Sequence, residues 1–65
     1  MGLDLDKMRD LRKQKRIPQR EMSLLLGFKS VSAYSRKESG ERPISTEEIA
    51  RIAQQLEVRV QDLFI

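Results

Sequence analysis

Apolar residues recur along this chain at intervals of three and four positions, and this spacing constrains the fold more than any other feature of the sequence. Leu5, Met8 and Leu11 follow it near the start, and a later segment repeats it with Ile49, Ile52, Ala53 and Leu56. Such spacing gathers apolar side chains on one face of an α-helix. Val58–Val60 alternates like a strand, but it is too short and has no partner segment. The sequence therefore predicts an all-α fold.

Proline, glycine and capping residues divide the chain into five short helical segments. Ile17-Pro18 ends the first, because a residue before proline disfavours the helical conformation. Gly27 suits the left-handed position that ends the second, and Ser45 begins the fourth with a capping box completed by Glu48. The predicted helices cover about residues 5–15, 19–25, from 30 or 32 to 38, and 45–56, with a short fifth helix ending at Leu63-Phe64. We expect them to surround one core, as a single domain of residues 1–65.

The absence of cysteine and histidine excludes several kinds of site. Disulfide bonds, thiolate or imidazole metal ligands and Cys–His or Ser–His nucleophile pairs all need one of these residues. No other constellation points to catalysis, so the sequence predicts no enzyme and no bound metal or cofactor. The longest apolar run, Leu24–Leu26, is far shorter than the ~20 residues that span a bilayer. Since missing cysteines also fit a reducing compartment, we expect a cytoplasmic protein.

The net charge of +3 is distributed unevenly along the chain. Residues 7–42 contain eleven Lys and Arg but only four Asp and Glu, whereas the segments on either side carry more acids than bases. A basic concentration of this kind favours a polyanionic partner. On charge alone, a solvated basic helix face is an equally good interpretation.

The segment from Gln19 to Glu38 carries the functional signal. It contains a short helix, a turn with Gly27 and a second helix, and Ser23 is small where the two helices would cross. The apolar residues available for contact between them are Met22, Leu26, Phe28 and Tyr34. This is the arrangement of a helix-turn-helix, whose second helix enters the DNA major groove. The pattern alone is only moderately specific, since short helix pairs are common in all-α domains.

Five segments match a known family: Met8–Arg12, Gln19–Gly27, Ser32–Gly40, Ile49–Leu56 and Asp62–Phe64. With them the chain resembles the Cro/lambda-repressor type of helix-turn-helix domain, also called the XRE family. The likeness as a whole extends from about Leu5 to Phe64, nearly the whole chain. The resemblance implies a compact five-helix domain that binds double-stranded DNA and regulates transcription in a phage, mobile element or bacterium. Because one helix in one groove gives limited specificity, we expect a homodimer on a palindromic operator, with half-sites roughly 34 Å apart. No small-molecule effector is evident.

The resemblance also implies DNA-binding roles for individual side chains. Those expected to hold phosphates are Gln19, Lys29 and Arg42, and those expected to face bases are Ser30, Val31, Ser32, Ser35 and Arg36. Arg36 is the sharpest candidate, because a guanidinium can donate to both major-groove acceptors of guanine. Val31 can make only an apolar contact, for instance with a thymine methyl group. Simpler roles are open for others: Gln19 as a helix former, Ser30 or Ser32 as a helix cap, and Ser35 as a solvent-facing residue.

The chain departs from the family pattern at several positions. One extra residue in the turn leaves the register of the base-facing side chains open by one, and Pro18 replaces the usual hydroxyl cap. Lys37 takes an apolar position, so we expect its stem along the core and its ammonium group outside. Glu57 stands where glycine is common, at a cost if it is left-handed. We also expect Tyr34 in the core with its hydroxyl at the surface. Glu38 is expected either to pair with a nearby cation or to cap locally.

Apolar residues outside the core pattern indicate where a second subunit or another protein would bind. The candidate dimer contacts are Leu24, Leu25, Phe64 and Ile65. Leu63 and Phe64 could instead close the core of the monomer. A protein-interaction module, such as an anti-repressor or an antitoxin-type partner that keeps the fold without binding DNA, is the alternative function. The sequence leaves open whether the chain is a whole regulator or part of a longer one.

Overall fold

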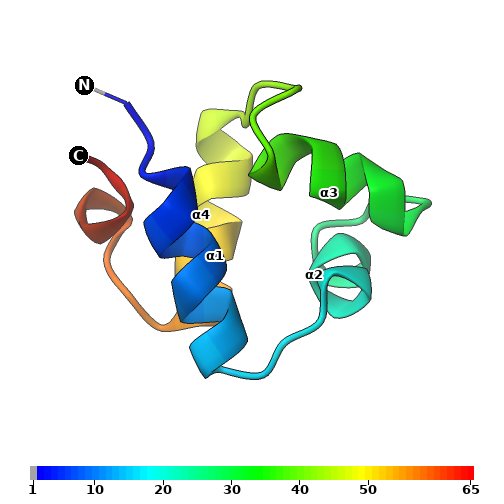
Figure 1. The fold of residues 1–65 in the computed structure, drawn as a ribbon, viewed down its shortest axis with the longest axis horizontal. Helices are drawn as coiled ribbons and strands as arrows, with labels where there is room; N and C mark the ends of the chain where they lie inside the picture. Colours follow the sequence, from blue (N-terminus) through cyan, green and yellow to red (C-terminus); the bar gives the residue numbers. More distant parts are fainter. Residues whose placement is uncertain (1) are drawn as a thin grey trace.

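The computed structural model describes residues 2–65, which form four α-helices and one short 3₁₀ helix (Figure 1). The α-helices are α1 (Leu5–Gln14), α2 (Gln19–Leu25), α3 (Val31–Glu38) and α4 (Thr46–Leu56). The expected fifth α-helix is wrong, because Val60–Leu63 forms only a 3₁₀ turn, η1. Among the described residues the only β-type pairing is an isolated bridge between Leu3 and Phe64. The all-α prediction is confirmed, with four α-helices rather than five.

All four α-helices end in the same way, with a left-handed residue directly after the last helical turn. Backbone N–H groups of this residue and the next one bond back to carbonyls of that turn, as in the Schellman arrangement. Glycine, which adopts a positive φ at no steric cost, occupies the position after α2 (Gly27, φ 81°) and α3 (Gly40, φ 90°). Arg16 (φ 58°) and Glu57 (φ 57°) occupy it after α1 and α4, so Glu57 does adopt the left-handed conformation that its position left open. These two ends carry strain that a glycine would remove.

Side chains cap the starts of two helices. The Asp4 carboxylate accepts a hydrogen bond from the backbone N–H of Lys7 at 3.0 Å, at the start of α1. At the start of α4, the Ser45 hydroxyl accepts from Glu48 N at 3.1 Å and the Glu48 carboxylate accepts from Ser45 N at 2.9 Å. The predicted capping box is therefore confirmed.

The helices of the predicted helix-turn-helix begin without such caps. Pro18 occupies the cap position of α2 and Ser30 that of α3, and neither side chain bonds to the helix backbone. The expected capping by Ser30 or Ser32 does not occur, because the two hydroxyl groups lie 3.1 Å apart and bond to each other. Both serines are exposed, so these hydroxyl groups also remain within reach of a partner.

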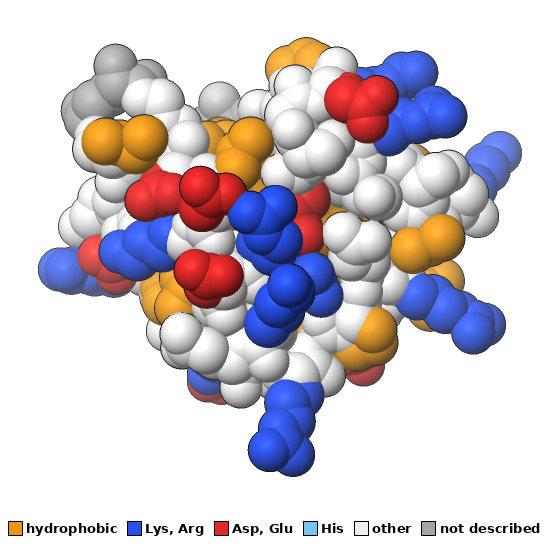
Figure 2. Space-filling view, viewed as in Figure 1, with side chains coloured by type: hydrophobic (Ala, Val, Ile, Leu, Met, Phe, Trp, Pro, Cys, Tyr) orange, Lys and Arg blue, Asp and Glu red, His pale blue; other side chains and the backbone are white. Residues whose placement is uncertain are grey.

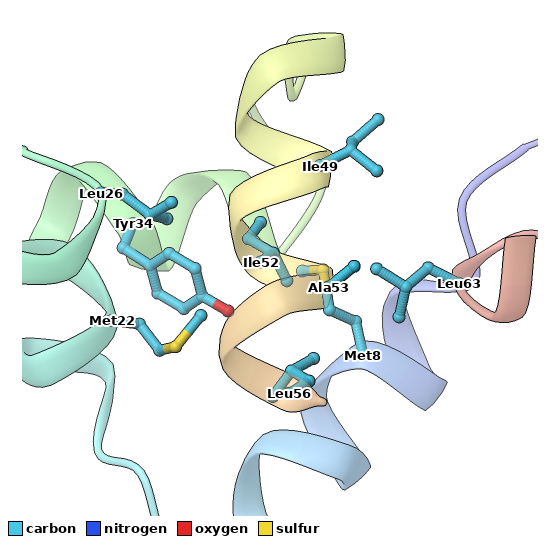
Figure 3. Close-up of a cluster of buried hydrophobic side chains, with 9 residues drawn as sticks. All are labelled: Met8, Met22, Leu26, Tyr34, Ile49, Ile52, Ala53, Leu56 and Leu63. Carbon is cyan, nitrogen blue, oxygen red and sulfur yellow. The ribbon is translucent and has the colours of Figure 1, made fainter. Parts of the chain in front are cut away.

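Helix α4 lies at the centre of the core and contributes four of its buried apolar side chains (Figure 3). These are Ile49, Ile52, Ala53 and Leu56, and the other buried apolar side chains are Met8, Met22, Leu26, Tyr34 and Leu63. Leu63 is fully buried, and Phe64 packs half-buried against the same cluster. The interpretation in which Leu63 and Phe64 close the monomer core therefore describes the fold.

The two ends of the described chain pair with each other on the side of the molecule away from α2 and α3 (Figure 1). Ile65 N donates to Gly2 O at 2.9 Å, and Asp4 N donates to Leu63 O at 2.7 Å. This pairing attaches η1 to the start of α1 and leaves the Ile65 side chain 79% exposed.

Candidate nucleic-acid interface

Helices α2 and α3 pack closely across a short turn. Ser23 is buried on α2, and its hydroxyl donates to the carbonyl of Ser30 at 2.5 Å. A longer side chain at this position would collide with the Ser30 backbone, so the small residue permits the close crossing. Gly27 reverses the chain between them with its positive φ. The structure therefore confirms the helix, turn and helix predicted between residues 19 and 38.

Helix α3 has one buried face and one open face. Tyr34 and Glu38 lie four residues apart and point inward, with 0% and 2% exposure. Since successive residues of a helix are about 100° apart, Ser32 and Arg36 lie on the opposite side, and both are exposed. Ser35 lies between the two faces and is half-buried. The open face of α3 is therefore centred on Ser32 and Arg36, and Val31 lies beside it on the first turn with 47% exposure.

A buried ion pair ties α1 to this helix pair. The Arg12 guanidinium donates to both carboxylate oxygens of Glu38, from Nε at 2.9 Å and from Nη2 at 3.1 Å, and also to the Ile17 carbonyl at 2.8 Å. Burial alone would raise the pKa of the Glu38 carboxyl, but hydrogen bonds from Arg12 and from the Gln19 amide hold that pKa below its usual value. The cation predicted as a partner for Glu38 is thus Arg12, and the pair fixes the orientation of α3.

Gln19, the first residue of α2, joins the same network. Its amide nitrogen donates to Glu38 at 3.1 Å. A side-chain amide carries two N–H donors, so one remains for another acceptor. The side chain is only half-buried, and the contact with Glu38 sets its direction.

The Tyr34 hydroxyl is not at the surface, so that expectation is wrong. The whole residue is 0% exposed, and its oxygen is buried without a hydrogen-bond partner of good geometry among the described residues. Burial and the nearby Glu38 carboxylate raise the pKa of Tyr34 well above its usual value. The hydroxyl lies inside, near the Arg12–Glu38 pair, which joins α1 to α3 and which the local sequence does not indicate.

The ammonium group of Lys37 is also more enclosed than expected. Its Nζ donates to the Glu48 carboxylate at 2.6 Å and to the Pro43 carbonyl at 3.3 Å, and lies 5.1 Å from the centre of the Phe28 ring. The side chain is 18% exposed, so Lys37 is a structural cation. Its bond to Pro43 holds the loop that carries Arg42.

Several cations project freely from the α2–α3 side of the molecule. Lys29, Arg36 and Arg42 are exposed, and none of them forms an ion pair within residues 2–65. Figure 2 shows blue side chains projecting from this side with apolar side chains between them, whereas acidic side chains gather mainly over α1. Most of the expected DNA-facing residues therefore lie on one side of the fold, with Gln19 at its edge.

Two further residues belong to this surface although the sequence reasoning did not select them. Arg20 is exposed on α2, one helical turn before Leu24, and Ala33 lines a shallow depression of about 200 Å³ together with Arg36 and Arg42. The signal for Arg20 was the four-residue spacing from Leu24 on the outer side of α2. For Ala33 a small side chain gives no comparable signal.

No cluster of acidic side chains within residues 2–65 could hold a metal ion, and no helix there is long and apolar enough to cross a membrane. A comparison with protein families matched residues 8–63 to a helix-turn-helix family model. Neither the curated proteins nor the solved structures gave a match. The matched range covers most of the chain, including all of α2, α3 and α4 and the turns between them. The chain therefore belongs to the Cro/lambda-repressor type of helix-turn-helix proteins, a family of DNA-binding regulators.

Proposed function

We propose that this protein regulates transcription by binding a palindromic DNA operator as a homodimer, with α3 in the major groove. The observation that carries the proposal is the open face of α3, where Ser32 and Arg36 stand opposite the buried Tyr34 and Glu38. Arg36 donates to a base edge, which we expect to be that of guanine, because a guanidinium can form two hydrogen bonds with the major-groove acceptors of guanine. The other base-facing residues are Ser30, Val31, Ser32 and Ser35. Occupying the operator would exclude or recruit the polymerase.

Phosphate contacts would come from the borders of this face. Lys29 in the turn and Arg42 in the loop after α3 are exposed cations on either side of it. The free N–H of the Gln19 amide serves the same purpose, because Glu38 already holds the other one. Backbone contacts of this kind fix the position of α3 without distinguishing sequences.

The size of the domain supports two copies on one operator. Its longest dimension is 28 Å, shorter than one turn of B-DNA, so a single copy contacts one half-site. Helix α2, which carries the exposed Leu24, and the C-terminal end, which carries the exposed Ile65, lie on opposite sides of the fold (Figure 1). We assign the contact between subunits to the Phe64–Ile65 end, because Leu24 borders the surface that would face DNA.

The proposal is tested with two arginine variants on an operator selected from genomic fragments by the purified protein. Arg36→Ala should weaken binding to the operator by about 1–3 kcal/mol and relax the preference at one base pair. Arg42→Ala should weaken binding to operator and scrambled duplex about equally. The slope of the logarithm of the binding constant against the logarithm of the salt concentration should become shallower by about one, as expected for one lost phosphate contact. Titrations of both duplexes at several salt concentrations measure these effects.

The two residues serve as controls for each other, since both are exposed arginines outside the core. Equal losses on both duplexes for Arg36→Ala would remove its base-contacting role. If the unmodified protein retained no fragment and bound no duplex even at low salt, the protein-interaction module would replace the regulator as the function.

A further inference from the structure

A depression of about 270 Å³ lies between α2 and the start of α3, beside the open face of α3. Leu24, Phe28 and Val31 supply its apolar walls, and Arg20 and Lys29 are the cations that line it. Leu24 is 68% exposed and Val31 is 47% exposed, so both apolar side chains are in contact with water. Leaving them there forgoes the stabilisation that burial would give, which suggests that a ligand covers them.

The charge around the depression indicates what kind of ligand this is. Arg20 and Lys29 contribute positive charge, and no acidic side chain lines the depression. The ligand therefore combines apolar and anionic character. The depression is also continuous with the proposed base-facing surface, since Ser30 and Val31 belong to both.

Double-stranded DNA presents this combination in its major groove. The apolar group on the base edges there is the C5-methyl group of thymine, and phosphates line both sides of the groove. A methyl group is far smaller than 270 Å³, so the depression has room for it and for the pyrimidine edge that carries it.

We propose that Leu24 of α2 and Val31 of α3 together contact the C5-methyl group of a thymine in each half-site. This deepens the proposed function and rests on it. Leu24 becomes a specificity-determining residue outside the recognition helix, and its exposure has a reason other than contact between subunits. Arg20 and Lys29 bind the phosphates that flank the thymine.

The test replaces the thymines of the selected operator by uracil, one position at a time. Uracil pairs with adenine as thymine does and lacks only the methyl group. With about 0.8 kcal/mol per buried methyl or methylene group, one substitution should weaken binding about fourfold at the contacted position, and about fifteenfold when both half-sites are changed. Other thymines should show little effect.

Side-chain variants identify which residues make the contact. Leu24→Ala and Val31→Ala should each bind the thymine operator more weakly and lose most of the difference between thymine and uracil. Leu25→Ala is the matched control, because Leu25 is a neighbouring exposed leucine that does not line the depression, and it should keep the full difference. All three positions lie at least 45% exposed, so the substitutions spare the core.

Each outcome distinguishes this inference from the proposed function. If the protein binds its operator but no uracil substitution weakens binding, the methyl contact is wrong and the DNA-binding function stands. A difference that survives in Leu24→Ala but disappears in Val31→Ala would remove Leu24 from the contact. Failure to bind any DNA would overturn both, and would leave the exposed leucines as a surface for a protein partner.

Discussion

Removing the Glu38 carboxylate should cost the domain much of its stability. Arg12 is 7% exposed, and its guanidinium donates to both Glu38 oxygens. In a Glu38→Ala variant this charge stays buried without its carboxylate, and breaking a buried pair from one side costs about 3–5 kcal/mol. At about 0.05–0.15 kcal/mol per residue, a domain of this size has only about 3–10 kcal/mol of unfolding free energy. We expect Glu38→Ala to unfold at low urea or to be partly unfolded without it.

The double variant Arg12→Met, Glu38→Leu provides the matched test, because apolar side chains of similar volume often replace a buried ion pair without loss. It should be at least about 2 kcal/mol more stable than Glu38→Ala. The double variant should still be slightly less stable than the unmodified protein, because the Ile17 carbonyl and the Gln19 amide lose their hydrogen-bond partners. Urea unfolding followed by far-ultraviolet circular dichroism measures both variants. A loss under about 1 kcal/mol for Glu38→Ala, or a double variant no more stable than it, would refute the reasoning.

Acid should weaken the same interaction. The pKa of Glu38 in the folded protein lies below its usual value, so its carboxylate contributes stability above the pKa of the unfolded chain, near 4.3. That contribution disappears as the pH falls through the lower, folded pKa. The urea midpoint of the unmodified protein should therefore drop on acidification below about pH 4.3, and the drop should be smaller in the double variant. If the urea midpoints of both proteins dropped equally, carboxylates other than Glu38 would be the main cause of the loss of stability in acid.

Four further substitutions test the stability of the fold and the contact between subunits. Arg16→Gly should raise the unfolding free energy by about 0.5–1 kcal/mol, because Arg16 is left-handed at φ 58°; an unchanged urea midpoint would mean that the position is unstrained. Tyr34→Phe should leave stability unchanged or raise it by about 1 kcal/mol, since the buried hydroxyl lacks a well-placed partner, whereas a clear loss would reveal a strong bond to Glu38. Ile65→Asp should shift sedimentation toward the monomer and Leu25→Asp should not; the reverse would move the subunit contact to α2.

Most helix boundaries could be predicted because the signals for them are local. Gly27 and the capping box at Ser45 act within a few residues, and the structure places helix ends there. The prediction of a fifth helix was wrong because the contact that ends it is not local. Phe64 extends to pair with Leu3 at the far end of the chain, which stops η1 after one turn, and no local pattern indicates that pairing.

The candidate site divides in the same way. The exposure of Leu24 and the location of Arg36 on α3 follow from helical spacing, and both could be predicted. The pairing of Glu38 with Arg12 and Gln19 could not, because Arg12 lies 26 residues and Gln19 lies 19 residues before Glu38 in the sequence. Contacts over that separation depend on how α1 packs against α3, which residue spacing within one segment does not specify.

The pairing of Gly2 with Ile65 determines how the domain can be joined to other chains. Because the two backbones meet at a 2.9 Å hydrogen bond, fusion partners or fluorescent labels attached at either end would leave from nearly the same place. That place is away from α2 and α3 (Figure 1). Such attachments would therefore keep clear of Arg36 and of the depression between α2 and the start of α3. In a tandem single-chain protein, the linker would need to cover only the gap between two neighbouring pairs of ends and not the width of a domain. Linker length would then set the spacing between two recognition helices carried on one polypeptide.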